Sequence, residues 1–490
     1  MATSNLSKGL HTKLFINNEY VPAKSGNLLT VRNPFDGTIV TDTIHCAGEA
    51  DVNDAVAAAQ NAYQGPWGQM AGQERAKRML ALADLLDAHS NELTKLESLT
   101  IGLPVTIARG IGSVMGAVWR YYAGFCDKLP GDFVPEGDDR VYKIVRYDPF
   151  GVCAGIGAWN ASLFFFCMKI APAIAAGNTF VFKSSEKSPL GALQIGELIV
   201  KAGFPPGVIN VINGDGSTGA SMASHMGIQR ISFTGSVGTG KAIQTAAAQS
   251  NLKRVTLELG GKSPSIVFDD ADLENALVHS SMSFLVHSGQ ICVAASRLLV
   301  HKKVADQFIA ELKARFEALS GASGNPAQDT TFLGPVVDEG QKDRIISLVN
   351  GVQKAKQDAV LTGGVSKDNF VSPTILVNPP LDSAAWTQEI FGPVLCVRVF
   401  ETEDEAIELA NATSYGLSSC IFTKDIPRAL RLAKRLQAAG VAINSNHQPD
   451  YDTPVAGWKQ SGNGSYEGGR AAILGYLQAK SVMINMAAKL

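Results

Sequence analysis

The chain has little of what marks a nucleic-acid-binding protein. Its 43 Lys and Arg residues nearly balance 45 Asp and Glu residues, which gives a formal net charge of −2. No block of consecutive basic residues forms a local patch. Binding to a polyanion depends on such a positive field. We therefore expect no nucleic-acid partner.

Cysteine is scarce, and a secretory signal is missing. The seven cysteines are scattered through apolar segments, and no two of them form a C-x-x-C pair. Closely spaced pairs are typical of zinc sites and of disulfide frameworks. Residues Met1 to Lys13 are polar and lack the apolar core of a signal peptide. We therefore expect reduced thiols, no metal site and a cytoplasmic protein.

A long uninterrupted apolar run is missing too. The stretch 161–182 has the length of a membrane span, but Lys169, Pro172, Gly177 and Asn178 interrupt it. A transmembrane helix needs about 20 predominantly apolar residues. We expect a buried helix that runs into a buried strand, and no membrane partner.

The sequence does have the alternating strand and helix pattern of a large α/β protein. A chain of 490 residues, 46% hydrophobic and 18% charged, is too long for one core, so two large domains are expected. Short strands alternate with helical periodicity, which predicts a mostly parallel, doubly wound sheet. The first series has predicted strands at 179–182, 208–212 and 230–234 and helices at 50–62, 73–89, 220–226 and 240–250. The second, after Gly261, has predicted strands at 265–268, 297–301 and 395–400 and helices at 304–319 and 403–411.

Two other segments have the pattern of exposed or edge strands. Residues 141–147 and 479–486 alternate between polar and apolar side chains, unlike buried parallel strands. Such strands can pair between subunits, so we expect a homo-oligomer, either a dimer or a tetramer.

A thiol and a carboxylate suggest two-step chemistry. Cys292 follows Gly289 and Gln290 in a turn-like stretch, and Glu258 lies earlier, in a predicted strand with Leu257. A thiolate can attack a carbonyl carbon, and a nearby carboxylate can deprotonate water for a second step. Two plainer interpretations stay open. A lone cysteine is more often a buried small hydrophobe, and a strand glutamate can face solvent at an edge.

Three polar motifs end predicted strands, where doubly wound sheets bind their ligands. The stretch 233–240 is rich in glycine and opens a helix, so its amides can approach a pyrophosphate. Lys183 and Glu186 can hold ribose hydroxyls through charge-assisted hydrogen bonds, and Asn160 can donate to an oxyanion. Each has a plain alternative as a strand-to-helix turn, a solvated helix cap or a turn residue.

In order and spacing, these motifs resemble the aldehyde dehydrogenase superfamily from about Leu14 to the C-terminus. The resemblance implies a Rossmann-type doubly wound cofactor domain, an α/β catalytic domain and a small β extension for oligomerisation. We place the NAD-binding domain at 1–130 and 149–258, the catalytic domain at 259–468, and the oligomerisation strands at 131–148 and 469–490. The matching pieces are Trp159-Asn160, 183–186, 233–240, 257–264, 289–292, 389–394 and 415–417.

The resemblance also implies roles for individual residues. Cys292 is the expected nucleophile, Glu258 the general base, and Asn160 with the Cys292 amide the oxyanion hole. A water chain past Lys169 is an alternative route for the thiol proton. The expected cofactor-binding residues are Ile156, Trp159, Lys183, Glu186, Gly235, Ser236, Gly240, Leu259, Glu389 and Phe391. Because a carboxylate at 186 repels a 2′-phosphate and accepts from a 2′-hydroxyl, NAD is expected rather than NADP.

The chain departs from the family pattern around the substrate. Ala161, Met168, Val286 and Val455 stand where aromatic residues are frequent, which suggests a wider pocket for a bulky or extended, largely apolar aldehyde. The expected pocket residues are Ala161, Phe165, Met168, Val286, Ile291, Val293, His447 and Val455. In the segment 461–467 the glutamate comes one place later than in the frequent pattern, so a proton-relay role for Glu467 is not predicted.

The expected function is thus NAD-dependent oxidation of a small-molecule aldehyde to the carboxylic acid. Cys292 forms a thiohemiacetal and then a thioester, and Glu258 assists its hydrolysis. A cofactor-independent thioesterase or esterase and a non-catalytic binding protein on the same fold are the alternatives.

Overall fold

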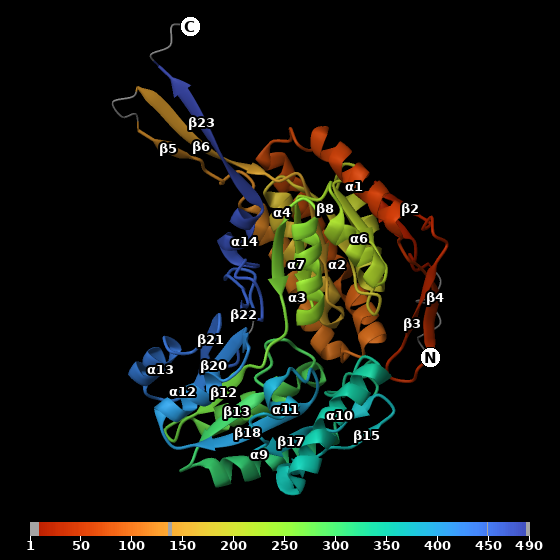
Figure 1. Ribbon diagram of the computed structural model, residues 1–490. Coiled ribbons are helices and arrows are strands. Elements are labelled where there is room, and N and C mark those ends of the chain that lie inside the picture. Colours follow the sequence, from red (N-terminus) through yellow and green to blue (C-terminus); the bar gives the residue numbers. More distant parts are fainter. Residues whose placement is uncertain (1–8, 136–139, 448, 487–490) are drawn as a thin grey trace.

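Two seven-stranded sheets and a projecting three-stranded sheet organise the chain (Figure 1). The computed structural model describes residues 9–135, 140–447 and 449–486. Within these residues, no helix is long and apolar enough to cross a membrane. The mixture of parallel sheets and helices confirms the predicted α/β fold class.

The first sheet is parallel at its centre and antiparallel at one edge. From β7 the chain builds outward in one direction through β8 and β9, and then returns to add β10 and β11 on the other side. Ligands bind at such a switch point, beyond the carboxyl ends of the strands. In spatial order the strands are β11 (Arg254–Glu258), β10 (Arg230–Thr234), β7 (Val152–Ile156), β8 (Thr179–Lys183), β9 (Ile209–Ile212), β1 (Leu14–Ile16) and β2 (Glu19–Val21).

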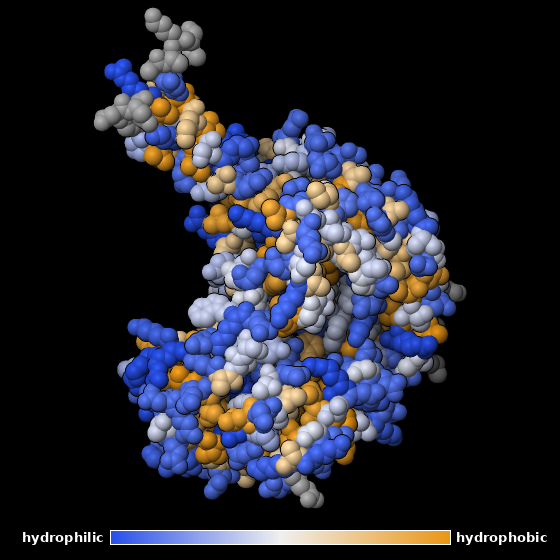
Figure 2. Space-filling view, viewed as in Figure 1, coloured by the Kyte–Doolittle hydropathy of each residue, from blue (hydrophilic) through white to orange (hydrophobic). Residues whose placement is uncertain are grey.

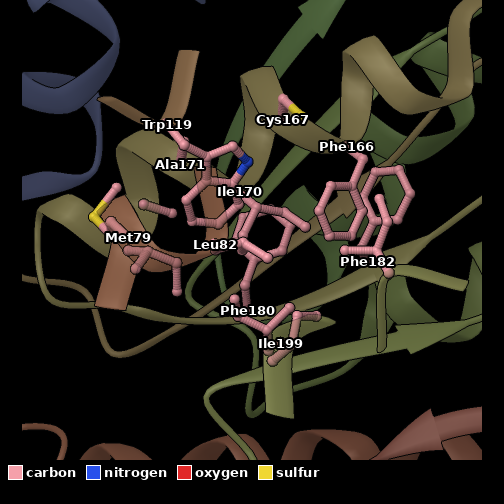
Figure 3. Packing of buried hydrophobic residues seen from close by; sticks show 14 of the residues in the cluster. Met79, Leu82, Trp119, Phe166, Cys167, Ile170, Ala171, Phe180, Phe182 and Ile199 are labelled. Carbon is pink, nitrogen blue, oxygen red and sulfur yellow. The ribbon is translucent and has the colours of Figure 1, made fainter. Parts of the chain in front are cut away.

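Helices cover both faces of this sheet because its strands are apolar on both sides. Phe180 and Phe182 of β8 join the core on one face, while Val181 joins the core on the other, as the twofold alternation of a strand requires. Figure 3 shows the first core, where Trp119 of α3 and Met79 of α2 pack near Phe180. Helices α2 (Gly72–Ile101), α3 (Val105–Ala123), α4 (Ser162–Ala175) and α5 (Leu190–Lys201) cover this face, and α1 (Glu49–Gln64), α6 (Gly216–Ser224) and α7 (Val237–Gln249) cover the other.

The second sheet is parallel except for one edge strand. Its spatial order is β14 (Val360–Thr362), β17 (Thr374–Val377), β18 (Val394–Phe400), β13 (Arg297–His301), β12 (Pro264–Val267), β20 (Ser418–Phe422) and β21 (Gly440–Ile443). Its helices are α8 (Leu273–Val278), α9 (Ala305–Ser320), α10 (Glu339–Ala355), α11 (Ala384–Thr387), α12 (Glu403–Asn411) and α13 (Ile426–Ala433). This sheet lies below the first in Figure 1.

A third sheet projects away from both larger ones. It pairs β23 (Leu477–Asn485) with β6 (Val141–Pro149) over nine residue pairs, and β6 with β5 (Asp132–Val134). The segments predicted as edge strands thus pair with each other inside the chain. Apolar side chains stay exposed on this arm, as Figure 2 shows. They include Phe133, Val134, Tyr142, Ile144, Met483 and Ile484.

Some predicted boundaries were wrong, and local capping explains one of them. The helix predicted at 220–226 is α6, which begins at Gly216. The Asp215 side chain accepts a hydrogen bond from the Ser217 amide and so caps the helix earlier than its apolar pattern indicates. Helix α2, predicted to end at His89, continues to Ile101.

Candidate active site

A cleft of about 610 Å³ lies beyond the carboxyl ends of β7, β8, β10 and β11. It brings together residues that are far apart in the sequence, from the strand ends of the first sheet and from loops and helix α10 of the second half of the chain. Cys292, Glu258 and Asn160 line it, and so do Lys183 and Glu186. The lining also includes Ile156, Trp159, Gly235, Ser236, Leu259, Glu389 and Phe391. Of the residues predicted for catalysis or cofactor binding, Gly240 and Lys169 are not part of the lining.

The loop before Cys292 has an unusual backbone. His287, Ser288 and Gly289 are all left-handed, with φ values of 52°, 53° and 71°. A side chain at Gly289 would begin 2.3 Å from the Gly392 carbonyl oxygen, so only glycine fits there. The Ser288 hydroxyl donates to the Gly334 carbonyl at 2.6 Å and anchors the loop. The sulfur is therefore carried by a loop whose conformation the surrounding structure imposes.

Glycines after Glu258 allow its segment and the Cys292 loop to approach each other. Glu258 ends β11, and the chain turns through Gly260 and Gly261. A Cβ on Gly261 would lie 2.3 Å from the Cys292 carbonyl oxygen, and one on Gly260 would lie 2.3 Å from Glu389 Oε2. The absence of these side chains brings the Glu258 segment and the Cys292 loop into backbone contact.

Asn160 and Gln290 join the first sheet to the Cys292 loop. Asn160 Nδ2 donates to the Gln290 carbonyl at 3.0 Å. The buried Gln290 side chain donates to the His287 carbonyl at 3.1 Å and accepts from the Val337 amide at 3.0 Å. A side-chain amide carries two N–H donors, so the second one on Asn160 can serve an oxyanion.

A buried ion pair lies behind Glu258. Lys169 of α4 is fully buried, and its ammonium lies 2.5 Å from Glu467 Oε1. Ser232 of β10 accepts from Lys169 Nζ at 2.8 Å and donates to the same carboxylate. Two backbone hydrogen bonds between Val455 and Glu467 fix the glutamate in place. Glu467, which the sequence analysis left out, is therefore part of the polar cluster around Lys169.

Burial and charge set the protonation of the reacting groups. Burial raises the pKa of Glu258 well above its usual value, the nearby Glu467 raises it further, and Lys169 lowers it. Burial also raises the pKa of the Cys292 thiol to about 12, with smaller contributions from Glu389 and Glu258. The thiolate is disfavoured unless a base takes its proton. The solvent-facing alternative for Glu258 is wrong, because only 7% of this residue is exposed.

The polar end of the cleft suits a dinucleotide. Ser236 caps α7, and its hydroxyl accepts from the Thr239 amide at 3.3 Å. Ser236 and Thr239 both line the cleft, so the start of this helix, where an anion is favoured, lies at the cleft. Lys183 is 4% exposed and lies 3.9 Å from Glu186, so it presents a cation beside a carboxylate. Gly240 packs against Leu259, since a Cβ there would lie 2.7 Å from the leucine side chain.

The loop 389–391 is held from α10. Arg344 donates to the Ile390 carbonyl at 2.7 Å, and Gln341 donates to the Phe391 carbonyl at 2.7 Å. Glu389 Oε1 accepts from the Gly261 amide at 2.9 Å, and burial raises its pKa to about 7. Gln341 and Arg344 line the cleft but were not predicted, because neither stands in a recognisable motif.

Comparison with known proteins decides the family. The model of the aldehyde dehydrogenase family matches residues 20–482. The chain belongs to the aldehyde dehydrogenase family. This confirms the resemblance, and with it the enzyme class: the protein is an oxidoreductase that oxidises aldehydes.

Similar proteins cover nearly all of this aldehyde dehydrogenase. An aldehyde dehydrogenase of Emericella nidulans is 43% identical over 474 residues, 96% of this chain and 94% of that protein. Retinal dehydrogenase 2 of Homo sapiens is 41% identical over 486 residues, 98% of this chain and 93% of that protein. The solved betaine aldehyde dehydrogenase from Staphylococcus aureus in complex with NAD+ is 35% identical, with a TM-score of 0.95 and coverage of 99% and 97%. Such relatives support a cofactor of the NAD type.

The predicted substrate-pocket residues are not part of the lining of this cleft. All eight are described by the structure, and none of them lines it. Phe165 and Met168 are on α4, Val286 and Ile291 flank the strained loop, and Val293 follows Cys292. His447 packs against Gly440, where a Cβ would lie 2.4 Å from the ring. Ala161 precedes α4, and Val455 pairs with Glu467. Their part in binding the aldehyde stays a prediction.

Proposed function

We propose that this aldehyde dehydrogenase uses NAD to oxidise a bulky or extended, largely apolar aldehyde to the carboxylic acid. One observation carries the proposal: Cys292, Glu258 and Asn160 line the same cleft as Lys183 and Glu186. This reaction needs a thiol, a base and an oxyanion donor at one end of the cleft. It also needs polar side chains that bind the cofactor ribose at the other end.

Cys292 begins the reaction as the nucleophile. Its thiolate attacks the aldehyde carbon and forms a thiohemiacetal, whose oxygen becomes an oxyanion. The free N–H of Asn160 Nδ2 and the Cys292 amide stabilise this charge, while the Asn160–Gln290 hydrogen bond keeps the donor oriented. Bound NAD supplies the hydride acceptor. Loss of the hydride leaves a thioester on Cys292.

Glu258 takes part as a base twice. It receives the thiol proton before attack, releases that proton to solvent water, and then deprotonates the water that hydrolyses the thioester. Its raised pKa makes it a strong proton acceptor once ionised. Lys169 and Glu467 stand next to it and adjust its charge state, with Lys169 favouring the ionised form and Glu467 opposing it.

The cleft fits NAD better than NADP. The side chain of Glu186 is 46% exposed and so is free to accept from a ribose 2′-hydroxyl, whereas it would repel a 2′-phosphate. Lys183, beside it, would donate to a ribose oxygen. The amides at the start of α7 would face the pyrophosphate, and Glu389 and Phe391 would lie at the nicotinamide end.

The substrate class rests on three sequence positions and on one relative. Small or aliphatic side chains at Ala161, Val286 and Val455 leave room where aromatic rings are frequent in the family. A relative that is 41% identical is named for retinal, which is an extended apolar aldehyde. Both observations favour a bulky substrate over acetaldehyde.

The domain plan and the assembly belong to the same proposal. The first sheet forms the cofactor domain, the second the catalytic domain, and the arm of β5, β6 and β23 an oligomerisation surface with exposed apolar side chains. We expect a homodimer or homotetramer through this arm. All seven cysteines are free thiols, which suits a reducing compartment such as the cytoplasm.

One experiment tests the reaction and the substrate class together. Purified protein is mixed with NAD and a panel of aldehydes that differ in chain length and aryl content, and NADH absorbance is followed. The same panel is run with Cys292→Ala and, as a matched control, with Cys153→Ala, which replaces a buried cysteine that does not line the cleft. We expect NADH with the parent and with Cys153→Ala, and none with Cys292→Ala. NADH formed by Cys292→Ala at the parental rate would refute the mechanism, and highest activity on acetaldehyde would refute the substrate class. Ester hydrolysis without any NADH would favour a cofactor-independent esterase.

A further inference from the structure

Glu97 is a buried acid without an ion-pair partner among the described residues. It lies on α2, near that helix's end, and only 1% of it is exposed. Its neighbours on the same helix face, Leu93, Thr94, Thr100 and Ile101, are buried as well. Burying a carboxyl group costs free energy unless its hydrogen bonds compensate, so the contacts that Glu97 makes indicate why it is there.

Glu97 contacts the start of α4, the helix that follows Asn160. Glu97 Oε2 accepts a hydrogen bond of 3.1 Å from the Ser162 amide. Burial raises the pKa of Glu97 to about 8, and hydrogen bonds from the Ser162 and Leu163 amides lower it. Both amides belong to the first turn of α4. Helix α2 therefore supplies a hydrogen-bond acceptor to the start of another helix.

Helix α4 needs this acceptor because its own sequence provides none. The residue at its N-cap is Ala161, whose methyl group cannot accept a hydrogen bond, and no side chain caps the helix locally. Asn160 precedes this residue in a short 3₁₀ turn, Trp159–Ala161. The turn that carries Asn160 runs directly into α4. A hydrogen bond that fixes the Ser162 amide therefore also fixes the backbone of this turn.

We propose that Glu97 is a positioning residue that holds the Asn160 amide in place for the oxyanion by capping α4 from α2. Asn160 is then fixed from two sides: through its Nδ2 bond of 3.0 Å to the Gln290 carbonyl, and through the backbone that Glu97 anchors. The proposal rests on the proposed function, in which Asn160 stabilises the oxyanion. Glu97 itself touches neither substrate nor cofactor.

The test compares an isosteric and an apolar replacement. Glu97→Gln keeps an oxygen that accepts the Ser162 N–H, whereas Glu97→Leu removes it. We expect Glu97→Leu to lower kcat/KM for the aldehyde by about tenfold to a hundredfold, as misplacement of an oxyanion donor does, and Glu97→Gln to restore most of it. The KM for NAD should change little in either variant. Glu92→Gln, an exposed glutamate on the same helix, is the matched control and should behave as the parent.

A double-mutant cycle with Asn160→Ala separates positioning from general stability. If Glu97 acts through Asn160, Glu97→Leu adds no further loss to Asn160→Ala. If the two losses multiply, or if Glu97→Gln loses as much as Glu97→Leu, the positioning role is overturned. Should Glu97→Leu not fold, Glu97→Asp replaces it, since its shorter side chain withdraws the carboxylate from the amide and should give the same loss.

The proposal and the proposed function fail differently. Parental activity in Asn160→Ala would remove the oxyanion role and the Glu97 proposal with it. A large loss in Asn160→Ala with parental activity in Glu97→Leu would overturn the Glu97 proposal alone.

Discussion

The ammonium of Lys169 lies 2.5 Å from Glu467 Oε1, in a buried position next to Glu258. Two carboxyl groups thus share the neighbourhood of one cation. The pair is expensive to bury, and removing one partner leaves an uncompensated charge. Its position beside the proposed base means that a change in either partner should appear in the pH dependence of the reaction.

Glu467→Gln should move the acid limb of the pH profile of hydrolysis to lower pH. Burial raises the pKa of Glu258, and Glu467 raises it further. Glu258 therefore stays protonated over a wider pH range, and its ionised form appears only at higher pH. Removing the charge at 467 lowers that pKa, so the ionised base appears earlier. The pH profile of thioester hydrolysis measures this. Lys169→Met should shift the limb in the opposite direction, and equal shifts in both variants would contradict the electrostatic account.

Glu258→Gln should separate the two halves of the reaction. An amide of nearly the same shape cannot deprotonate water, so hydrolysis slows strongly. The first hydride transfer slows much less, because the thiol proton can leave by the alternative route, a water chain past Lys169. Rapid mixing with NAD and aldehyde should then give a burst of NADH of about one equivalent per active site, followed by slow turnover. Unchanged steady-state turnover without a burst would remove Glu258 from its role as the base for hydrolysis.

The sequence could indicate which residues share the cleft, because each stands in a local motif; their roles stay predictions. Cys292, Glu258, Asn160, Lys183 and Glu186 are far apart in the chain, and all of them line one cleft. Each follows a strand end or a glycine turn, and parallel strands gather their carboxyl ends at one edge of a sheet. The family and the fold class could therefore be predicted, and both are confirmed.

The residues that were missed depend on tertiary structure. Glu467 lies one position away from its usual place, but pairing with Val455 returns its side chain to Lys169. Gln341 and Arg344 act from a helix that precedes the loop 389–391 by many residues, and no periodicity connects them to it. Glu97 could have been noticed in the sequence, because it is an acid on the buried, mostly apolar face of its helix.

Gly261→Ala should damage the site more than the fold. A Cβ at this position would begin 2.3 Å from the Cys292 carbonyl oxygen, and both partners are backbone-fixed, so the Cys292 loop must move. Overpacking of this kind costs about 1–3 kcal/mol, and the displaced thiol should lower kcat by about a hundredfold. Thermal unfolding and single-turnover rates measure the two effects. Gly351→Ala on α10, which meets no atom within 4 Å, is the control and should be neutral or stabilising.

Glu186→Gln should weaken the discrimination against NADP. The carboxylate that would repel a 2′-phosphate is lost, while Lys183 stays 3.9 Å away and becomes free to pair with the phosphate. We expect the ratio of kcat/KM for NAD to that for NADP to fall by about tenfold, the equivalent of one moderate charge interaction. Steady-state assays with both cofactors measure it. An unchanged ratio would mean that another group selects the cofactor.

Lys187→Ala should speed the release of NADH. Lys187 lines the cleft after β8, and its ammonium lies 2.5 Å from Asp338 Oδ2 at the start of α10. In the proposed function, this pair bridges the cofactor domain and the catalytic domain beside the bound cofactor. Both side chains are partly exposed, at 34% and 41%, so the bridge is worth at most about 1 kcal/mol, or roughly a fivefold change in rate. Asp338 also caps α10 by accepting from the Gln341 amide at 2.8 Å, which is why the lysine is the partner to replace.

Stopped-flow fluorescence of bound NADH at low and high salt gives the release rate. The acceleration should disappear at high salt, where the parental bridge is screened as well. Lys24→Ala, which breaks a surface pair of the same length with Asp54, should leave the rate unchanged. A release rate for Lys187→Ala equal to the parent's at low salt would show that the bridge does not retain the cofactor.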